Sequence, residues 1–252
     1  MSDLTILLLI KDRNTFTQRW VSYYNKNNFN IPVYIADGSR DNSAINYFQN
    51  NKNFFYTYFG FDKDFNTYRK KVIQALGKIK TKYVLFASND DLYLKQGISR
   101  ALNVLKRNPL YSASRGAIRT FSVNTQTGLY GKLIVKNNLY EYSSINENTA
   151  DARILEFINK SNGIWHDIIR RETILKAWEN SKKYNLNNIL LHDLYTYFFV
   201  CSKGRCARGK YLFMLHQDHA NRLGLDETYN KSEFILSDLI RNTNMGKRFI
   251  DK

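Results

Sequence analysis

Cysteine and proline are scarce in this sequence, which has two of each among 252 residues. Two thiols, Cys201 and Cys206, are too few for a disulfide scaffold or a four-thiolate zinc site, so we expect them to be reduced and structural. Two prolines and 12 glycines leave few candidate linkers, and neither a low-complexity segment nor an internal repeat is visible. These absences favour a single domain over residues 1–252.

Long hydrophobic runs are absent as well. The apolar run near the N-terminus, Ile6 to Ile10, is far shorter than a signal peptide or a membrane-spanning segment. It follows an acid, Asp3, where a signal peptide would carry basic residues. We therefore expect a soluble, cytoplasmic protein. The hydrophobic content of 43% is ample for a globular core.

Acidic residues are few relative to basic ones. The chain carries 38 Lys and Arg against 22 Asp and Glu, a formal charge of +16. Residues 63–119 hold 13 of the basic residues but only three acids. Such a field attracts polyanions, which include nucleotide diphosphates, nucleic acids and anionic membrane faces. A solvated, lysine-rich surface would account for about half of the same side chains.

Residues 4 to about 120 alternate between predicted strands and helices. Branched, apolar runs predict the strands, and apolar residues at helical spacing predict the helices. The strands cover 4–10, 33–36, 54–59 and 83–88, and the helices cover 15–24, 65–79 and 98–105. This order is typical of a doubly wound α/β sheet.

The rest of the chain is less regular. It predicts a hairpin over 128–135 and a strand over 211–215. The predicted helices cover 150–159, 172–182 and 190–201, and Ser232 can cap a last helix.

The strand that begins at Tyr83 is followed by two adjacent carboxylates, Asp90 and Asp91. A short apolar run of this kind is typical of a strand buried on both faces. Both acids are therefore expected at its carboxyl end, where open α/β sheets hold their ligands. Mg²⁺ or Mn²⁺ would relieve their mutual repulsion and could also hold a diphosphate. A solvated turn is the alternative for this segment taken alone.

Three further polar clusters lie at the ends of predicted elements: Asp37, the pair His192 and Asp193, and the run 216–219. Carboxylates at one sheet edge can divide the work, one group holding a metal and another removing a proton. Asp193 falls in the first turn of a predicted helix, which would lower its pKa, so it needs partial burial to act as a base. The alternative is an ordinary first-turn acid.

The histidines differ in how well they are placed for chemistry. His216 follows a predicted strand and could bring an imidazole to a metal held by Asp91, with His219 as a competing choice. His166 and His192 are more often packing residues than ligands. A zinc site built from His216, His219 and a cysteine fits no standard spacing.

Four segments resemble, in their order and spacing, the GT-A glycosyltransferases of the family-two type, which use nucleotide-sugar donors. The segments are Leu7 to Arg13, Ile35 to Ser39, Asn66 to Lys70 and Phe86 to Asp91. Arg69 lies on the helix before the Asp-Asp strand, where a guanidinium could meet a phosphate in bidentate fashion unless it is only a surface charge. The resemblance implies donor contacts from Lys11, Arg13, Asp37, Ser39, Arg69, Asn89 and Asp90.

In that family an acidic pair on a later helix supplies the base that deprotonates the acceptor hydroxyl. Residues 190–194 are similar to this segment, and Asp193 is the matching residue. The stretch 163–172 resembles the segment that borders the acceptor. Two positions depart from the pattern: Ser88 stands where an aspartate is common, and His192 replaces the usual glutamate.

The resemblance implies an α/β GT-A fold, in which helices flank a central mixed sheet. It implies a donor half over 1–120 and an acceptor half with C-terminal helices over 121–252. The implied reaction transfers a sugar, with inversion, from a nucleotide-sugar donor to a hydroxyl of a glycan, a lipid-linked or a cell-envelope saccharide. Mg²⁺ or Mn²⁺ on Asp90, Asp91 and His216 would stabilise the leaving diphosphate. The basic excess favours peripheral contact with the inner membrane face, and no nucleic acid partner is expected.

Three other functions stay open at this point. A sugar nucleotidyltransferase shares the sheet and the acids, but it normally has a glycine-rich loop after the first strand, and Lys11 to Thr15 contains no glycine. A nucleic-acid-binding module would explain the charge and the interleaved aromatics, but not the aspartates at strand ends. A catalytically silent, glycan-binding relative is the third, because Ser88 departs from the aspartate motif.

Overall fold

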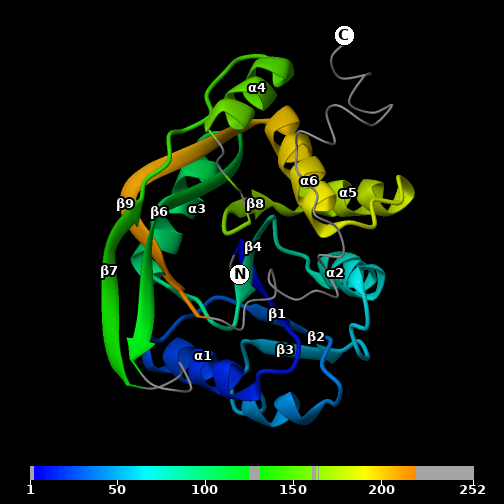
Figure 1. The fold of residues 1–252 in the computed structure, drawn as a ribbon, viewed down its shortest axis with the longest axis vertical. Coiled ribbons are helices and arrows are strands. Elements are labelled where there is room, and N and C mark those ends of the chain that lie inside the picture. Colours follow the sequence, from blue (N-terminus) through cyan, green and yellow to red (C-terminus); the bar gives the residue numbers. More distant parts are fainter. Residues whose placement is uncertain (1–2, 125–130, 161–162, 164, 220–252) are drawn as a thin grey trace.

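A curved, mixed β-sheet runs through the molecule and carries helices on both faces (Figure 1). The computed structural model describes residues 3–124, 131–160, 163 and 165–219. Within these residues the sheet has nine strands in the order β3-β2-β1-β4-β8-β6-β9-β5, with β7 beside β6. The strands are β1 Leu4–Ile10, β2 Val33–Asp37, β3 Phe54–Tyr58, β4 Tyr83–Ser88, β5 Leu92–Tyr93, β6 Tyr111–Asn124, β7 Lys132–Tyr140, β8 Ile168–Arg170 and β9 Arg205–Gln217.

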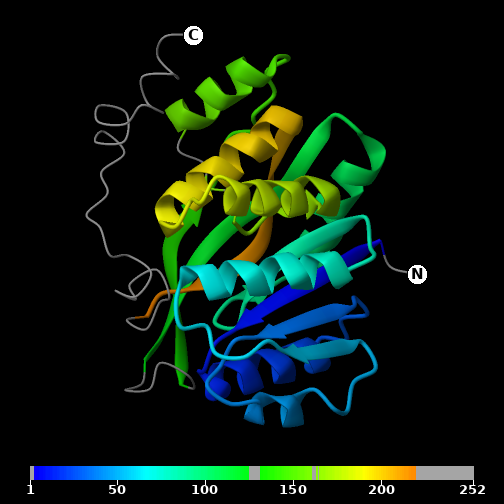
Figure 2. The same ribbon diagram turned by 90° about the vertical axis from the view of Figure 1, so that its right-hand side faces the viewer.

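The helices form a layer on each face of the sheet. α1 and α3 pack on one face, and α2, α5 and α6 lie on the other, where Figure 2 shows them in front of the sheet. The helices are α1 Asn14–Lys26, α2 Phe65–Lys78, α3 Lys95–Arg107, α4 Ala150–Lys160, α5 Arg171–Lys183 and α6 Ile189–Lys203, and a short 3-10 helix, η1, covers Ser43–Tyr47. The predicted α/β class with a central mixed sheet is confirmed.

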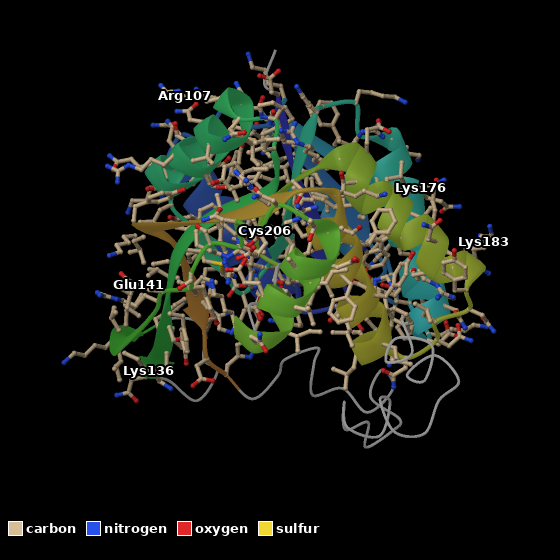
Figure 3. All side chains as sticks on the ribbon, turned by 90° about the horizontal axis from the view of Figure 1, so that it is seen from above. Arg107, Lys136, Glu141, Lys176, Lys183 and Cys206 are labelled. Carbon is tan, nitrogen blue, oxygen red and sulfur yellow. The ribbon has the colours of Figure 1, made fainter. Side chains whose placement is uncertain are left out.

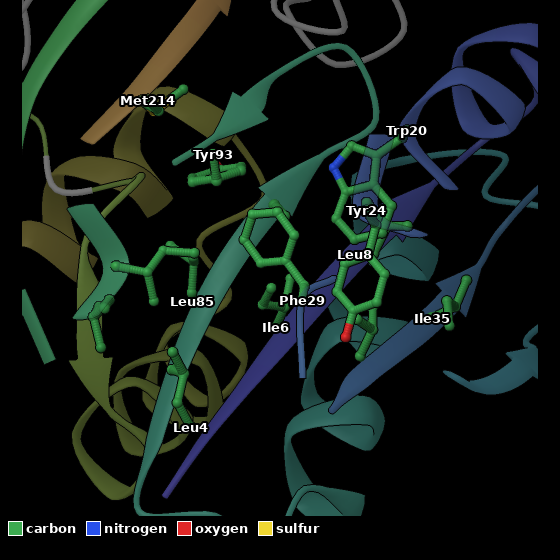
Figure 4. Packing of buried hydrophobic residues seen from close by; sticks show 14 of the residues in the cluster. Leu4, Ile6, Leu8, Trp20, Tyr24, Phe29, Ile35, Leu85, Tyr93 and Met214 are labelled. Carbon is green, nitrogen blue, oxygen red and sulfur yellow. The ribbon is translucent and has the colours of Figure 1, made fainter. Parts of the chain in front are cut away.

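The two faces of β1 belong to two separate hydrophobic clusters. Leu4, Ile6 and Leu8 are buried in the cluster that includes Trp20 of α1 (Figure 4), whereas Leu7 is buried in the cluster of α2 and α5. Side chains alternate along a strand, so β1 must be apolar on both faces to serve both layers. For this reason residues 6–10 of β1 form an unbroken apolar run.

Strands β1, β2 and β4 are parallel, and their carboxyl ends coincide. Ile10 of β1 lies beside Asp37 of β2, and Leu9 of β1 lies beside Ser88 of β4. The segments that follow these strands, from Lys11, Gly38 and Asn89 onward, therefore begin at one edge of the sheet. This edge is where strand-helix alternation places the ligands of open α/β sheets.

The sheet is completed by β6 to β9, of which periodicity predicted β7 and β9 in part and β6 and β8 not at all. β8 lies antiparallel between β4 and β6, and the long strands β6 and β9 run parallel to each other. No strand was expected over the 14 residues of β6, because Arg115, Gly116 and Arg119 interrupt its apolar pattern. β9 covers 13 residues and is longer than the predicted strand over 211–215.

Part of the predicted hairpin lies in the described residues, whereas the predicted last helix does not. β7 pairs antiparallel with β6, so the paired strands cover 111–124 and 132–140 and extend well beyond the predicted 128–135, and residues 125–130 lie outside the described residues. The helix expected from Ser232 also lies outside them. In the described part of the chain, none of the helices has both the length and the apolar character that crossing a bilayer requires.

Side-chain caps set the first residues of α2 and α6. Asp64 accepts the Thr67 N–H at 2.8 Å, and the Thr67 hydroxyl accepts the Asp64 N–H at 3.1 Å, which is a reciprocal capping box. Asn188 accepts the N–H groups of the second and third residues of α6. α6 thus begins at Ile189, and Asp193 follows its first turn, one residue further in than expected.

Two helical glycines should respond in opposite ways to a methyl group. In Gly97→Ala of α3 the new Cβ would lie 2.6 Å from the Leu212 carbonyl oxygen and 2.7 Å from the Phe213 Cα, so we expect it to lower the free energy of unfolding by about 1–3 kcal/mol. At Gly77 of α2 nothing lies within 4 Å. Gly77→Ala should therefore raise this free energy, by up to about 1 kcal/mol. Urea denaturation measures the change in the free energy of unfolding in both variants. Equal changes in the two variants would contradict the packing of α3 on β9.

Candidate active site

The turn after β1 is tied to the turn after β2. Asp12 and Arg13 both have positive φ, 53° and 61°, a backbone conformation that is uncommon in residues other than glycine. The Asp12 N–H donates to Ser39 Oγ at 2.7 Å, and the Arg40 N–H donates to Asp12 Oδ1 at 3.0 Å. These bonds hold the unusual turn in place and keep Lys11, Arg13 and Ser39, three predicted donor contacts, at the same edge.

Asp37, the last residue of β2, is fully buried. Its carboxylate accepts the Tyr56 hydroxyl at 2.6 Å and the Ser39 N–H at 2.8 Å. The structure therefore places this predicted donor contact at the carboxyl edge. It also adds Tyr56, which no sequence pattern indicated.

A buried ion pair contacts the end of β1 and the turn after β2. Lys71 Nζ lies 2.5 Å from Asp62 Oδ2 and donates to the Ile10 carbonyl oxygen at 3.2 Å. A Cβ at Gly38 would lie 2.0 Å from Asp62 Oδ2, so only glycine fits against the pair. No role was predicted for Lys71 or Asp62. The two residues are nine positions apart in the sequence, and an ion pair of this kind leaves no periodic signal.

Asp90 is held between Arg13 and His219. Its Oδ2 accepts from Arg13 Nη2 at 2.9 Å and lies 2.8 Å from His219 Nε2. Burial alone would raise the pKa of Asp90, but the hydrogen bond with His219 and the charge of Arg13 outweigh burial and hold this pKa well below its ordinary value. Asp90 is therefore ionised, and its charge is balanced within the protein.

Asp91 brings together two histidines from distant parts of the chain. His216 Nδ1 lies 2.9 Å from Asp91 Oδ1, and His166 Nδ1 lies 3.8 Å from Asp91 Oδ2. The backbone N–H of Gln217 also donates to Asp91 Oδ1, at 3.1 Å. Across the described residues, ligand atoms from Asp91, His166 and His216 lie within 4.8 Å of one another, which is close enough to share one metal ion.

This metal-ligand group, Asp91, His166 and His216, differs in part from the predicted set. Asp91 and His216 belong to it, whereas Asp90 does not, because Asp90 is paired elsewhere. His166, which we expected to be a packing residue, is the third member of the group. Burial lowers the pKa of His166 to about 4, so its ring is neutral, as a metal ligand must be.

A cavity of about 600 Å³ lies beside the metal-ligand group. His166 and His216 line it, together with Arg115, Trp165 and Tyr197. Aromatic walls with a few convergent polar groups are typical of ligand sites. The two predicted aspartates at the end of β4 are thus not in bulk solvent: both are buried, and one of them contacts two residues that line this cavity.

Asp193 lies on α6, one helical turn before Tyr197. Burial raises the pKa of Asp193 to about 7, and burial followed by the charge of Asp193 raises the pKa of Tyr197. A carboxylate with a pKa near 7 can take a proton at neutral pH. Its neighbour His192 is buried against Trp178, with ring centroids 4.1 Å apart, and is the packing residue that we expected.

Arg69 and Asn89 have partners within the protein rather than open positions at the edge. The terminal nitrogens of Arg69 donate to the carbonyl oxygens of Ser181 and Leu186, at 3.1 and 2.7 Å, and to two asparagine side chains. Its guanidinium is committed to the segment between α5 and α6, so the phosphate contact suggested for it is not retained. Asn89 donates to Thr17 of α1 at 3.0 Å.

The sheet and the acid-histidine group at its carboxyl edge belong to one α/β fold, and solved structures similar to it show that this fold is GT-A-like. No protein-family model matches the chain, and the comparison with curated proteins gives no match either. Among solved structures, S. aureus TarS 1–349 in complex with UDP-GlcNAc is similar, with a TM-score of 0.59 and 13% identity over 96% of this chain and 67% of that one. A second structure of S. aureus TarS 1–349 is similar as well, with a TM-score of 0.58 and 13% identity over 85% of this chain and 60% of that one.

These likenesses show the fold. The chain spans about 60% of the length of the TarS 1–349 chain. A CMP:2-keto-3-deoxy-manno-octonic acid synthetase complexed with CTP also superposes, but with a TM-score of 0.47 and 8% identity it is too distant to bear on function.

Loss of a side chain from the metal-ligand group should weaken Mn²⁺ binding. We expect His166→Ala and His216→Ala to lower the affinity at least about tenfold, because each removes one donor from the group. Isothermal titration calorimetry measures the affinity, and Asp41→Asn, a change of an exposed acid, serves as the control. An unchanged affinity in His166→Ala would remove this histidine from the group.

Proposed function

We propose that the protein is a glycosyltransferase that moves a sugar from a nucleotide-sugar donor to a hydroxyl group of a saccharide acceptor, with the help of a divalent metal ion. The observation that carries this proposal is the group Asp91, His166 and His216 beside a cavity at the carboxyl edge of a GT-A-like sheet. The TarS structures in complex with UDP and with UDP-GlcNAc favour a uridine-linked donor.

The metal-ligand group fits Mn²⁺ better than Mg²⁺. Mg²⁺ prefers oxygen ligands alone, whereas one carboxylate and two imidazoles form a mixed set that Mn²⁺ accepts more readily. When bound, the ion would neutralise the diphosphate of the donor as it leaves. Arg19 donates to the backbone carbonyl oxygen of Asp90 at 3.1 Å, next to Asp91 in the sequence, and its positive charge favours an anionic donor.

Asp193 is the proposed base. It takes the proton of the acceptor hydroxyl while the acceptor oxygen forms a bond to the anomeric carbon and the bond from that carbon to the diphosphate breaks. A single displacement from the face opposite the leaving group inverts the anomeric centre. Burial fits Asp193 for this step, because a carboxyl with a pKa of about 7 is basic enough to accept a proton and still half ionised at neutral pH.

Both halves of the chain contribute to this reaction. In the proposal, residues 1–120 supply the donor contacts Lys11, Arg13, Asp37 and Ser39 together with Asp91. Residues 121–252 supply His166, Asp193 and His216. A lipid-linked acceptor and contact with an anionic membrane surface remain expectations that rest on the formal charge of +16.

A screen of nucleotide sugars tests the donor. We expect one nucleotide class among UDP-, GDP-, CMP- and dTDP-sugars to raise the melting temperature in the presence of Mn²⁺, because a bound donor stabilises the folded state. The Mn²⁺-dependent part of the shift should be lost in Asp91→Asn and kept in Asp41→Asn. If all nucleotides are inert while single-stranded RNA or DNA binds tightly, the binding-module alternative takes the place of the enzyme.

The pH dependence of transfer tests Asp193. Its raised pKa keeps the carboxyl protonated at low pH, so the rate should rise with pH and level off above about 7. Asp193→Asn should keep donor binding and lower turnover by about 10²–10⁴-fold, without that rise. Nucleotide release measures turnover, and undiminished turnover in the variant would remove Asp193 as the base.

A further inference from the structure

Two buried arginines share one buried carboxylate inside the protein. Arg208 Nη1 lies 2.8 Å from Asp167 Oδ2, and Arg115 Nε lies 3.3 Å from Asp167 Oδ1. All three side chains are at most 3% exposed. Figure 3 shows Cys206, two residues before Arg208 on β9, near the centre of the molecule. The cluster therefore carries two positive charges and one negative charge in the protein interior.

The surplus positive charge is unfavourable in this position. Arg115 of β6 and Arg208 of β9 are register partners on neighbouring strands, so like charges lie side by side. Burial and the charge of Arg208 lower the pKa of Arg115, although a guanidinium stays charged at neutral pH. Among the described residues, Asp167 is the only acid within ion-pair distance of either arginine. A buried charge without a full partner is costly, which points to a further anion from outside this cluster.

Arg115 is the arginine of this cluster that faces the cavity. It lines the same cavity as His166 and His216, and its Nη2 has no hydrogen-bond partner among the residues that the structure describes. Its guanidinium also lies 4.5 Å from the centre of the Tyr142 ring, another residue of the cavity wall. A guanidinium beside a ring, with an N–H group that is not bonded to the described residues, is suited to bind a carboxylate or a phosphate, because hydrogen bonds between charged partners are strong.

We propose that Arg115 binds an anionic group, a carboxylate or a phosphate, of the acceptor, so that the acceptor is an acidic saccharide. This inference rests on the glycosyltransferase function proposed above. The rings of Tyr142, Trp165 and Tyr197 line the same cavity and offer apolar surface to a sugar. The proposed base, Asp193, lies one turn before Tyr197. The donor diphosphate belongs at the metal-ligand group, and Arg115 therefore serves the second substrate.

Thermal-shift titrations with small probes test this site on the full chain. Sodium glucuronate presents a carboxylate, glycerol 3-phosphate presents a phosphate, and methyl glucoside is the neutral control. Each probe is titrated with and without saturating UDP and Mn²⁺. We expect at least one acidic probe, and not the neutral one, to raise the melting temperature in both conditions, and the concentration dependence gives its affinity.

Variants of Arg115 separate binding from folding. Arg115→Gln leaves Arg208 paired with Asp167 as a balanced ion pair, and we expect it to bind the acidic probe at least about tenfold more weakly. Arg115→Lys keeps the charge but loses the planar fork of the guanidinium. Its affinity for the acidic probe should therefore lie between those of the unchanged protein and Arg115→Gln. Lys176→Gln changes an exposed lysine on α5, at the rim of the molecule in Figure 3, and should bind the probe as the unchanged protein does.

Each outcome decides for or against the site. Equal responses to acidic and neutral probes overturn the proposal, and so does an Arg115→Gln variant that keeps its affinity; if this variant does not fold, Arg115→Lys and the unchanged protein decide. Loss of probe binding when UDP and Mn²⁺ are present also overturns it, because the guanidinium then serves the donor. If the acidic probe binds through Arg115 while every nucleotide is inert, the anion site stands and the glycosyltransferase assignment falls.

Discussion

The contact between Asp91 and the end of β9 holds the site together. The Asp91 Oδ1 atom is engaged by His216 Nδ1 at 2.9 Å and by the Gln217 N–H at 3.1 Å. The strand that follows Asp91, β5, pairs with β9 as well. His166 arrives from the segment before β8, which pairs with β4. One carboxylate is thus oriented by three separate parts of the sheet, and the cavity beside it depends on all of them.

Most buried charges near this contact are balanced by a partner. Lys71 is paired with Asp62, and Asp90 is paired with Arg13, so neither ion is exposed to the full cost of leaving water. Arg115 is the exception, because it shares its carboxylate with another arginine. On α6, Asp193 is only partly ionised at pH 7, because burial raises its pKa to about 7. In the proposed reaction the acceptor gives a proton to Asp193 and an anionic group to Arg115.

Sequence patterns predicted the parallel strands β1 to β4, because short runs of branched, apolar and aromatic residues between polar segments are typical of strands. They missed β6, since a buried arginine such as Arg115 is tolerated only through Asp167 and the cavity, which are remote in the sequence. In the site, Asp91 and His216 were predictable from their places at strand ends. His166 follows no predicted element, and only the pairing of β8 with β4 brings it near Asp91. The burial of Arg69 likewise depends on the segment after α5, which its own helix does not reveal.

The position of β9 also affects the order of events during synthesis. β9 is the last described strand, yet it lies between β6 and β5 in the sheet. A nascent chain that has made β1 to β8 therefore still lacks His216 and the N–H that orients Asp91. Contacts between such distant segments form late, because closing the long loop costs entropy before it is repaid. If the group binds a metal ion as proposed, the newly made protein should gain this affinity only in the final stage of folding, once β9 has left the ribosome.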